Sequence, residues 1–181
     1  MKNLFNFIAF QTVWFAAVLG AAHQLDWAGP LAFAAFTLAH FSFNNSHRRE
    51  DIILLIIAVS VGTLLDSAYK LSHLLVYQGW TVAAYLAPLW ISVLWGNIAL
   101  TLNHSLSWLR GKILLAILFG AIGAPLSYLA GAHLGALEIL PPTWFGLTVI
   151  GIAWAVMTPV LTNLLRTTSD EPSSLAQRST Q

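Results

Sequence analysis

The ionisable side chains with the types and spacing for chemistry inside a membrane lie in one apolar run. The run extends from Ile52 to Tyr77 and is long enough to cross a bilayer. Within it, Asp66, Lys70 and His73 stand at positions i, i+4 and i+7, so a helix would place all three on one face. Such groups are costly in a membrane span and usually face the bundle interior or a wet cavity. Two interpretations stay open: an intrahelical pair of Asp66 with Lys70, or Asp66 as a proton carrier or binding group in a cavity.

A second polar stripe accompanies a later apolar run. Asn97, Thr101 and His104 recur there at helical spacing. Hydrogen bonds between packed helices would explain them, and so would the lining of a polar and aromatic pocket. In a catalytic pocket, Asp66 or His104 would be the proton-transfer group, because each can titrate. The ligand cavity that we predict is lined by Asp66, Tyr69, Trp90, Asn97, Asn103, His104 and Tyr128.

The six His residues raise the question of a metal or a haem. The chain has no cysteine and no His-Glu-x-x-His or His-x-x-x-His motif, so we predict no metal site and no cofactor. One alternative stays open. His40 and His104 would lie near the inner face and His73 and His133 near the outer face, which resembles the di-haem b-type cytochromes. Haem b on His40 and His104 would make the chain an electron-transfer protein.

The composition indicates a membrane protein. Of the 181 residues, 57% are hydrophobic and 8% are charged, whereas an ordinary soluble domain has about 25% charged residues. The net charge of +1 is too small for a nucleic-acid-binding protein. We expect one transmembrane domain over residues 1–165 and a disordered cytoplasmic tail over residues 166–181, which are mostly polar.

Six apolar runs predict an all-α fold, a bundle of six transmembrane helices. Lys and Arg occur at the amino end, in the second and fourth loops and in the tail, and the other three loops have none. The positive-inside rule therefore places both termini in the cytoplasm. Cleavage of the first run as a signal peptide, after Gly20-Ala21-Ala22, is an alternative that would leave five helices. The runs are Leu4–Ala22, Ala28–Phe43, Ile52–Tyr77, Ala83–Trp108, Ile113–Gly131 and Trp144–Leu165.

Several short motifs, each present once, lie between the first and the fifth run. They are Phe10-Gln11-x-x-Trp14-Phe15, Gly62-Thr-Leu-Leu-Asp66-Ser, Pro88-Leu-Trp90 with Leu94-Trp95, Thr101-Leu-Asn103-His104-Ser-Leu and Gly120-Ala-x-Gly-x-Pro125-Leu-Ser-Tyr128-x-Ala-Gly131. In this order they resemble a family of small bacterial inner-membrane proteins described as a domain of unknown function. The resemblance implies no established activity. Members are often encoded beside cyclopropane-fatty-acid-synthase-like methyltransferases and flavin oxidoreductases, which implies a part in membrane-lipid modification or the response to membrane oxidation.

We therefore expect a bacterial inner-membrane protein that binds or handles a membrane lipid, with lipid-modifying enzymes as partners and no nucleic acid. The sequence leaves open whether it is an enzyme. A small proton-coupled transporter that uses Asp66 and the haem protein with His40 and His104 are the alternatives.

Overall fold

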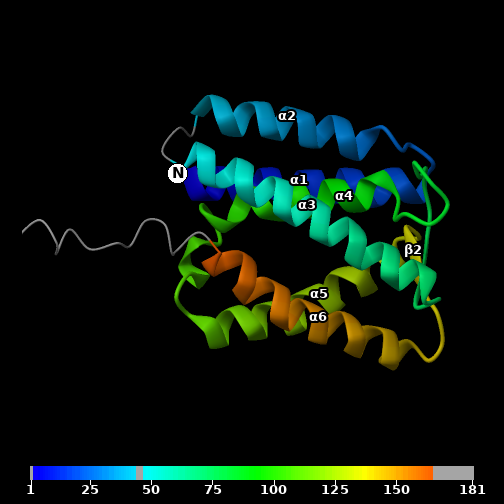
Figure 1. The fold of residues 1–181 in the computed structure, drawn as a ribbon. Coiled ribbons are helices and arrows are strands. Elements are labelled where there is room, and N and C mark those ends of the chain that lie inside the picture. The colour runs from blue at the N-terminus through cyan, green and yellow to red at the C-terminus, as the bar shows by residue number, and fades with distance from the viewer. Residues whose placement is uncertain (1, 44–46, 165–181) are drawn as a thin grey trace, which may run out of the picture.

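The computed structural model of the protein describes residues 2–43 and 47–164 (Figure 1). Over these residues the fold is all-helical, with six α-helices, one 3-10 helix and two short strands. The elements are α1 (Lys2–Ala22), α2 (Ala28–Phe43), α3 (Arg48–Leu71), β1 (Leu75–Tyr77), α4 (Leu89–Leu102), η1 (Ser107–Leu109), α5 (Ile113–His133), β2 (Leu137–Ile139) and α6 (Thr143–Asn163). The tail predicted over residues 166–181 lies outside the described residues.

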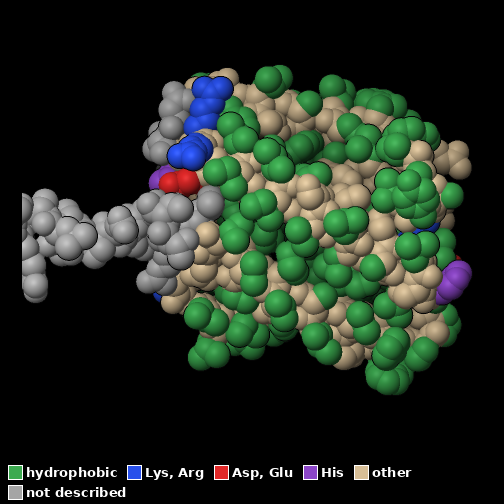
Figure 2. All heavy atoms as spheres, viewed as in Figure 1, with side chains coloured by type: hydrophobic (Ala, Val, Ile, Leu, Met, Phe, Trp, Pro, Cys, Tyr) green, Lys and Arg blue, Asp and Glu red, His purple; other side chains and the backbone are tan. Residues whose placement is uncertain are grey.

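The six helices lie side by side, and successive helices run in opposite directions (Figure 1). One end, which we call the basic end, carries the starts of α1, α3 and α5 and the ends of α2, α4 and α6. Lys and Arg side chains gather at this end, whereas hydrophobic and uncharged side chains cover the flank that Figure 2 shows. The opposite end, the strand end, carries β1 and β2.

Four helices, α1, α3, α5 and α6, are long and apolar enough to cross a membrane, judged over the described residues. α2 and α4 are apolar but shorter, at 16 and 14 residues. The predicted runs agree with α1, α2, α5 and α6 to within a few residues. The run Ala83–Trp108 is corrected, because α4 covers only its middle. Pro88, which has no backbone N–H to donate, stands directly before α4.

α4 is the central helix of the fold. It packs against α1, α2, α3 and α6, and most of its side chains are buried. This position explains why its sequence is mostly apolar, as expected for a helix enclosed by others, with its few polar side chains such as Asn97 bonded within the protein. α5 packs mainly against α6, and Gly120 allows the two backbones to approach closely, because a side chain there would overlap the Trp154 carbonyl.

The two strands correct the predicted helix over Ile52–Tyr77. α3 ends at Leu71, His73 follows with a positive φ of 55°, and β1 then pairs antiparallel with β2. In this pair Leu75 lies opposite Ile139, with both side chains buried. His73 therefore does not share a helical face with Asp66. The pairing joins two loops far apart in the sequence, so local patterns did not predict it.

Candidate functional site

A buried carboxylate, Asp66 of α3, collects three hydrogen bonds near the strand end. The Tyr77 and Tyr128 hydroxyls donate to its Oδ1 at 2.7 and 2.6 Å, and the Trp95 indole Nε1 donates to its Oδ2 at 2.7 Å. Asp66 is fully buried. Its donors come from β1, α4 and α5, so this one side chain links four elements of the fold.

Local sequence explains why an indole fits beside this carboxylate. Gly62 lies one helical turn before Asp66, and a side chain at Gly62 would overlap the Trp95 ring. On its other side, Trp95 stacks on Trp154 of α6, with ring centroids 4.3 Å apart and an angle of 15° between the planes. The indole is therefore held between α3 and α6, with its N–H directed at Asp66.

The interpretation that pairs Asp66 with Lys70 is wrong. Lys70 Nζ donates to the Leu86 carbonyl at 2.9 Å, and among the described residues no ion pair joins Lys70 to a carboxylate. Tyr77 provides a donor instead. Burial raises the pKa of the Tyr77 hydroxyl well above its usual 10.0, and the charge of Asp66 raises it further, so this hydroxyl keeps its proton.

A crevice of about 380 Å³, which we call the lateral crevice, lies beside this cluster. Its lining comes from α1, α4, α5, α6 and β2 and is mostly apolar, with Gln11, Ser127 and Tyr128 as polar exceptions. Phe119 and Leu126, which also line it, are exposed by 37% and 60%, so the crevice is open to the outside of the helical bundle. Aromatic rings form much of its wall: Phe10, Trp14, Trp90, Trp95, Phe119, Tyr128 and Trp154.

Two features of the crevice bear on what could enter it. The Trp14 indole donates to the Ser127 hydroxyl at 3.0 Å, which ties α1 to α5 across the crevice. Gly123 of α5 also lines it, and a Cβ added there would meet no atom within 4 Å. The space at Gly123 is therefore open and can be filled by a substitution.

The structure divides the predicted cavity residues between two ends of the bundle. Trp90 and Tyr128 line the lateral crevice, Asp66 lies behind Trp95 and Tyr128, and the Tyr69 ring contacts Tyr128 with centroids 6.4 Å apart. Further along α4, Asn97 donates to the Phe10 carbonyl of α1 at 3.0 Å, as packed helices do. Asn103 and His104 lie at the basic end.

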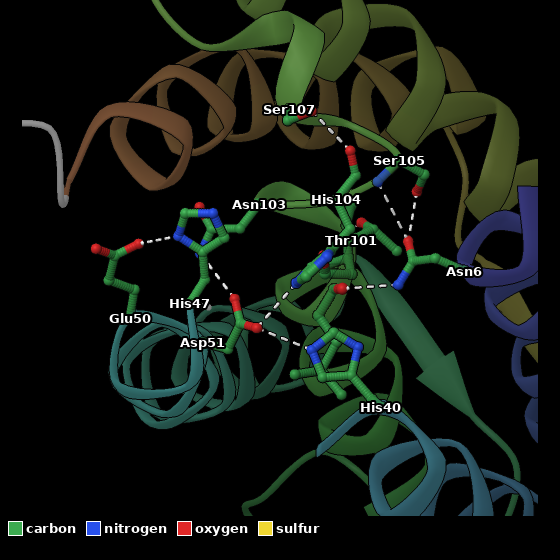
Figure 3. Close-up of polar contacts among 12 residues, drawn as sticks. Asn6, His40, His47, Glu50, Asp51, Thr101, Asn103, His104, Ser105 and Ser107 are labelled. Carbon is green, nitrogen blue, oxygen red and sulfur yellow. Dashed lines mark hydrogen bonds and ion pairs between the residues drawn. The ribbon is translucent and has the colours of Figure 1, made fainter. Parts of the chain in front are cut away.

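At the basic end, Asn103 and His104 converge on a second buried carboxylate, Asp51 (Figure 3). The Nε2 atoms of His40 and His104 lie 2.8 and 2.9 Å from Asp51 Oδ2. The Asn103 amide donates to Asp51 Oδ1 at 2.8 Å, and Arg110 donates to the Asn103 carbonyl oxygen. The cluster thus joins α2, the start of α3 and the turn after α4.

Sequence reasoning missed several of these residues. Asp51 was not singled out, because it lies in the first turn of α3, where a carboxylate is common as a partner of the helix N-terminus. Trp95, which donates to Asp66, and Trp154, which stacks on Trp95, gave no local sign of these roles. Tyr77 lies beside Asp66 because of the strand pair. A signal was present, since His40 and His104 lie in other apolar runs and a buried imidazole needs a polar partner such as Asp51.

These observations define an all-helical protein with four helices able to cross a membrane, which indicates a multi-pass membrane protein. The chain belongs to the family described as "Protein of unknown function (DUF2878)", whose model matches residues 3–160. The resemblance to an uncharacterised family is thereby confirmed. No curated protein and no solved structure matches the chain.

Proposed function

We propose that this protein is a six-span protein of the bacterial inner membrane that binds the hydrocarbon chain of a membrane lipid in the lateral crevice. The observation that supports the proposal is the crevice itself, with apolar and aromatic walls and an opening on the outside of the bundle. A lipid chain in the bilayer could enter such a crevice from the side without passing through water. Aromatic rings supply large apolar contact surfaces for it.

The size of the crevice limits what it would hold. Its volume of about 380 Å³ is at the small end of the roughly 300–1,000 Å³ typical of ligand pockets. The crevice therefore suits a segment of one acyl or isoprenoid chain better than a whole phospholipid. Gln11, Ser127 and Tyr128 provide the few polar groups that could fix a chain bearing an oxygen function.

The topology that we propose has both termini in the cytoplasm. Arg48 and Arg49 begin α3, and Arg110 and Lys112 lie in the connection between α4 and α5, all at the basic end. Positive charge at the ends of the spans favours the cytoplasmic side. The shorter α2 and α4 would cross as members of the bundle. Enclosure of α4 by other helices supports this, because its polar groups then meet protein rather than lipid.

The environment of Asp66 supports lipid binding over proton-coupled transport. Its two oxygens already accept three hydrogen bonds from the protein, and no part of the residue is exposed. A proton carrier has to exchange protons with water during its cycle. This arrangement favours an anchoring role for Asp66 at the wall of the crevice.

Substitution of Gly123 by Phe tests the proposal, because the new ring would occupy open space in the crevice. The matched control is Ile122→Phe, one residue away on the exposed side of α5, where Ile122 is 57% exposed. Native mass spectrometry of each protein, purified in mild detergent, measures the lipid that stays bound. We expect wild type and Ile122→Phe to retain a lipid and Gly123→Phe to lose it.

Two results would contradict lipid binding in the crevice. One is a wild-type protein that retains no lipid under these conditions. The other is a Gly123→Phe variant with unchanged helical circular dichroism that retains as much lipid as Ile122→Phe, since the lipid would then lie elsewhere on the surface.

A further inference from the structure

We infer that His40, Asp51 and His104 form a binding site for one divalent first-row transition-metal ion at the basic end. One ligand atom from each side chain can be chosen so that all three lie within 4.8 Å of one another. The three residues come from separate elements that only the fold brings together (Figure 3). The inference does not depend on the lateral crevice, which is lined by other residues.

The distances leave little movement to be made when an ion binds. Asp51 Oδ2 lies 2.8 Å from His40 Nε2 and 2.9 Å from His104 Nε2. In a tetrahedral site with bonds of about 2.0–2.1 Å, neighbouring ligand atoms lie roughly 3.3 Å apart. An ion would therefore lengthen the two distances to Asp51 Oδ2 by about half an ångström.

The charge of the cluster favours a cation. The side chains of Asp51 and His40 are completely buried, and a buried charge needs an ion pair or a metal. Among the described residues, Asp51 lies within ion-pair distance of these two imidazoles and of no Lys or Arg. Neutral imidazoles would leave the carboxylate charge without a counter-ion, and a divalent ion would supply one.

The neighbours of the cluster orient its ligand atoms. The Asn103 amide binds Asp51 Oδ1, which leaves Oδ2 facing both imidazoles. Arg110 in turn fixes the Asn103 amide by donating to its oxygen. Such outer contacts are the usual means by which proteins position metal ligands.

The ligand set indicates the class of ion and its access. Two imidazoles and a carboxylate suit zinc, iron, cobalt or nickel better than magnesium or calcium, which prefer oxygen ligands. Three protein ligands leave at least one coordination position open. The His104 side chain is 10% exposed, so the site can be reached from the basic end. The imidazole centroids of His40 and His104 are only 4.5 Å apart, which favours a single ion over a porphyrin between them.

Cobalt provides the test, because Co²⁺ bound by protein nitrogen and oxygen atoms in a tetrahedral site absorbs strongly in the visible range. The protein is purified in detergent without a histidine tag, stripped with a chelator and titrated with Co²⁺ and then with Zn²⁺. We expect one equivalent of Co²⁺ to bind with visible bands that Zn²⁺ removes. We also expect the melting temperature to rise with Zn²⁺, since a ligand of the folded state stabilises it.

Variants separate this site from others on the chain. His104→Ala and Asp51→Asn should lose the bands and the Zn²⁺-dependent rise in melting temperature, whereas Asn103→Ala should bind about 10–100-fold more weakly. The control is His133→Ala, which removes an exposed histidine at the strand end. The Gly123→Phe variant should bind the metal normally, which keeps this test independent of the lipid proposal.

Two outcomes would overturn the metal site. A wild-type protein that binds neither ion at micromolar concentration excludes it, whatever the variants do. Equal binding by wild type and a His104→Ala variant with unchanged circular dichroism places the ion elsewhere.

Discussion

The contacts of Asp66 predict how its replacement would change the stability of the protein. In Asp66→Asn, an amide replaces a carboxylate of the same shape. Three donors, from Tyr77, Tyr128 and Trp95, face the two oxygens of Asp66. The orientation that keeps both tyrosine bonds turns the NH₂ group against the Trp95 N–H, so that bond is lost and a buried donor is left unpaired. In the other orientation both tyrosine hydroxyls have to change from donors to acceptors, which leaves their own protons without the carboxylate.

The size of the effect follows from the number of bonds broken. Interhelical hydrogen bonds in membrane proteins contribute about 0.6 kcal/mol on average and up to about 1.7, and bonds to charged groups about 1.5–3 kcal/mol. Loss of the Trp95 bond in Asp66→Asn should therefore cost about 1–2 kcal/mol. Asp66→Ala removes all three bonds and should cost about 3–5 kcal/mol, a large part of the roughly 5–15 kcal/mol of a typical protein.

The assay is unfolding by sodium dodecyl sulfate in mixed micelles, followed by circular dichroism and tryptophan fluorescence. Fluorescence is informative because Trp95 stacks on Trp154 beside the carboxylate. Glu138→Gln is the matched control, an exposed carboxylate changed to its amide on β2. If Asp66→Asn proves as stable as Glu138→Gln, the three hydrogen bonds do not hold this part of the fold together, and the reasoning fails.

Two further predictions concern the same region. Gly62→Ala should destabilise the protein by about 1–3 kcal/mol, because the methyl group would overlap the Trp95 ring. Gly123→Ala should cost nothing, because its methyl group points into open space. Equal effects of the two substitutions in the unfolding assay would count against the packing described for Trp95. In a double-mutant cycle, Lys70→Met and Asp66→Asn should show a coupling energy below about 0.5 kcal/mol, because Lys70 binds the Leu86 carbonyl rather than Asp66. A coupling energy above about 1 kcal/mol would instead support the intrahelical pair of Asp66 with Lys70.

Much of the helical framework could be predicted from hydropathy alone. Ala28–Phe43 was predicted with the bounds that α2 has, and α1, α5 and α6 differ by a few residues. The helix ends that were predicted wrongly are those where the sequence stays apolar beyond the end of the helix. Leu75–Tyr77 remains apolar but pairs with Leu137–Ile139, and hydropathy does not distinguish a short strand from a further helical turn.

The site was predicted in part, and the missing part depends on tertiary packing. Asp66 and Tyr128 were identified because polar groups in apolar runs are costly and usually bonded. The distance that separates them from Asn103 and His104 was not predicted. Helical periodicity shows which face of a helix a residue lies on, but it does not show which polar residues of different helices lie at the same level of the bundle. Asp51 was not predicted as a site residue, because the two histidines that contact it lie 11 and 53 residues away along the chain.

The order in which Asp66 acquires its partners has a consequence for biosynthesis. Tyr77 follows Asp66 by 11 residues and Trp95 by 29, but Tyr128 follows by 62. At about 5–20 residues per second, a ribosome needs roughly 3–12 s to make those 62 residues. During this interval the carboxylate has only its earlier donors, and β1 has an unpaired edge. A nascent chain that ends after the first four helices therefore lacks both the Tyr128 hydroxyl and the partner strand of β1, which α5 and β2 supply.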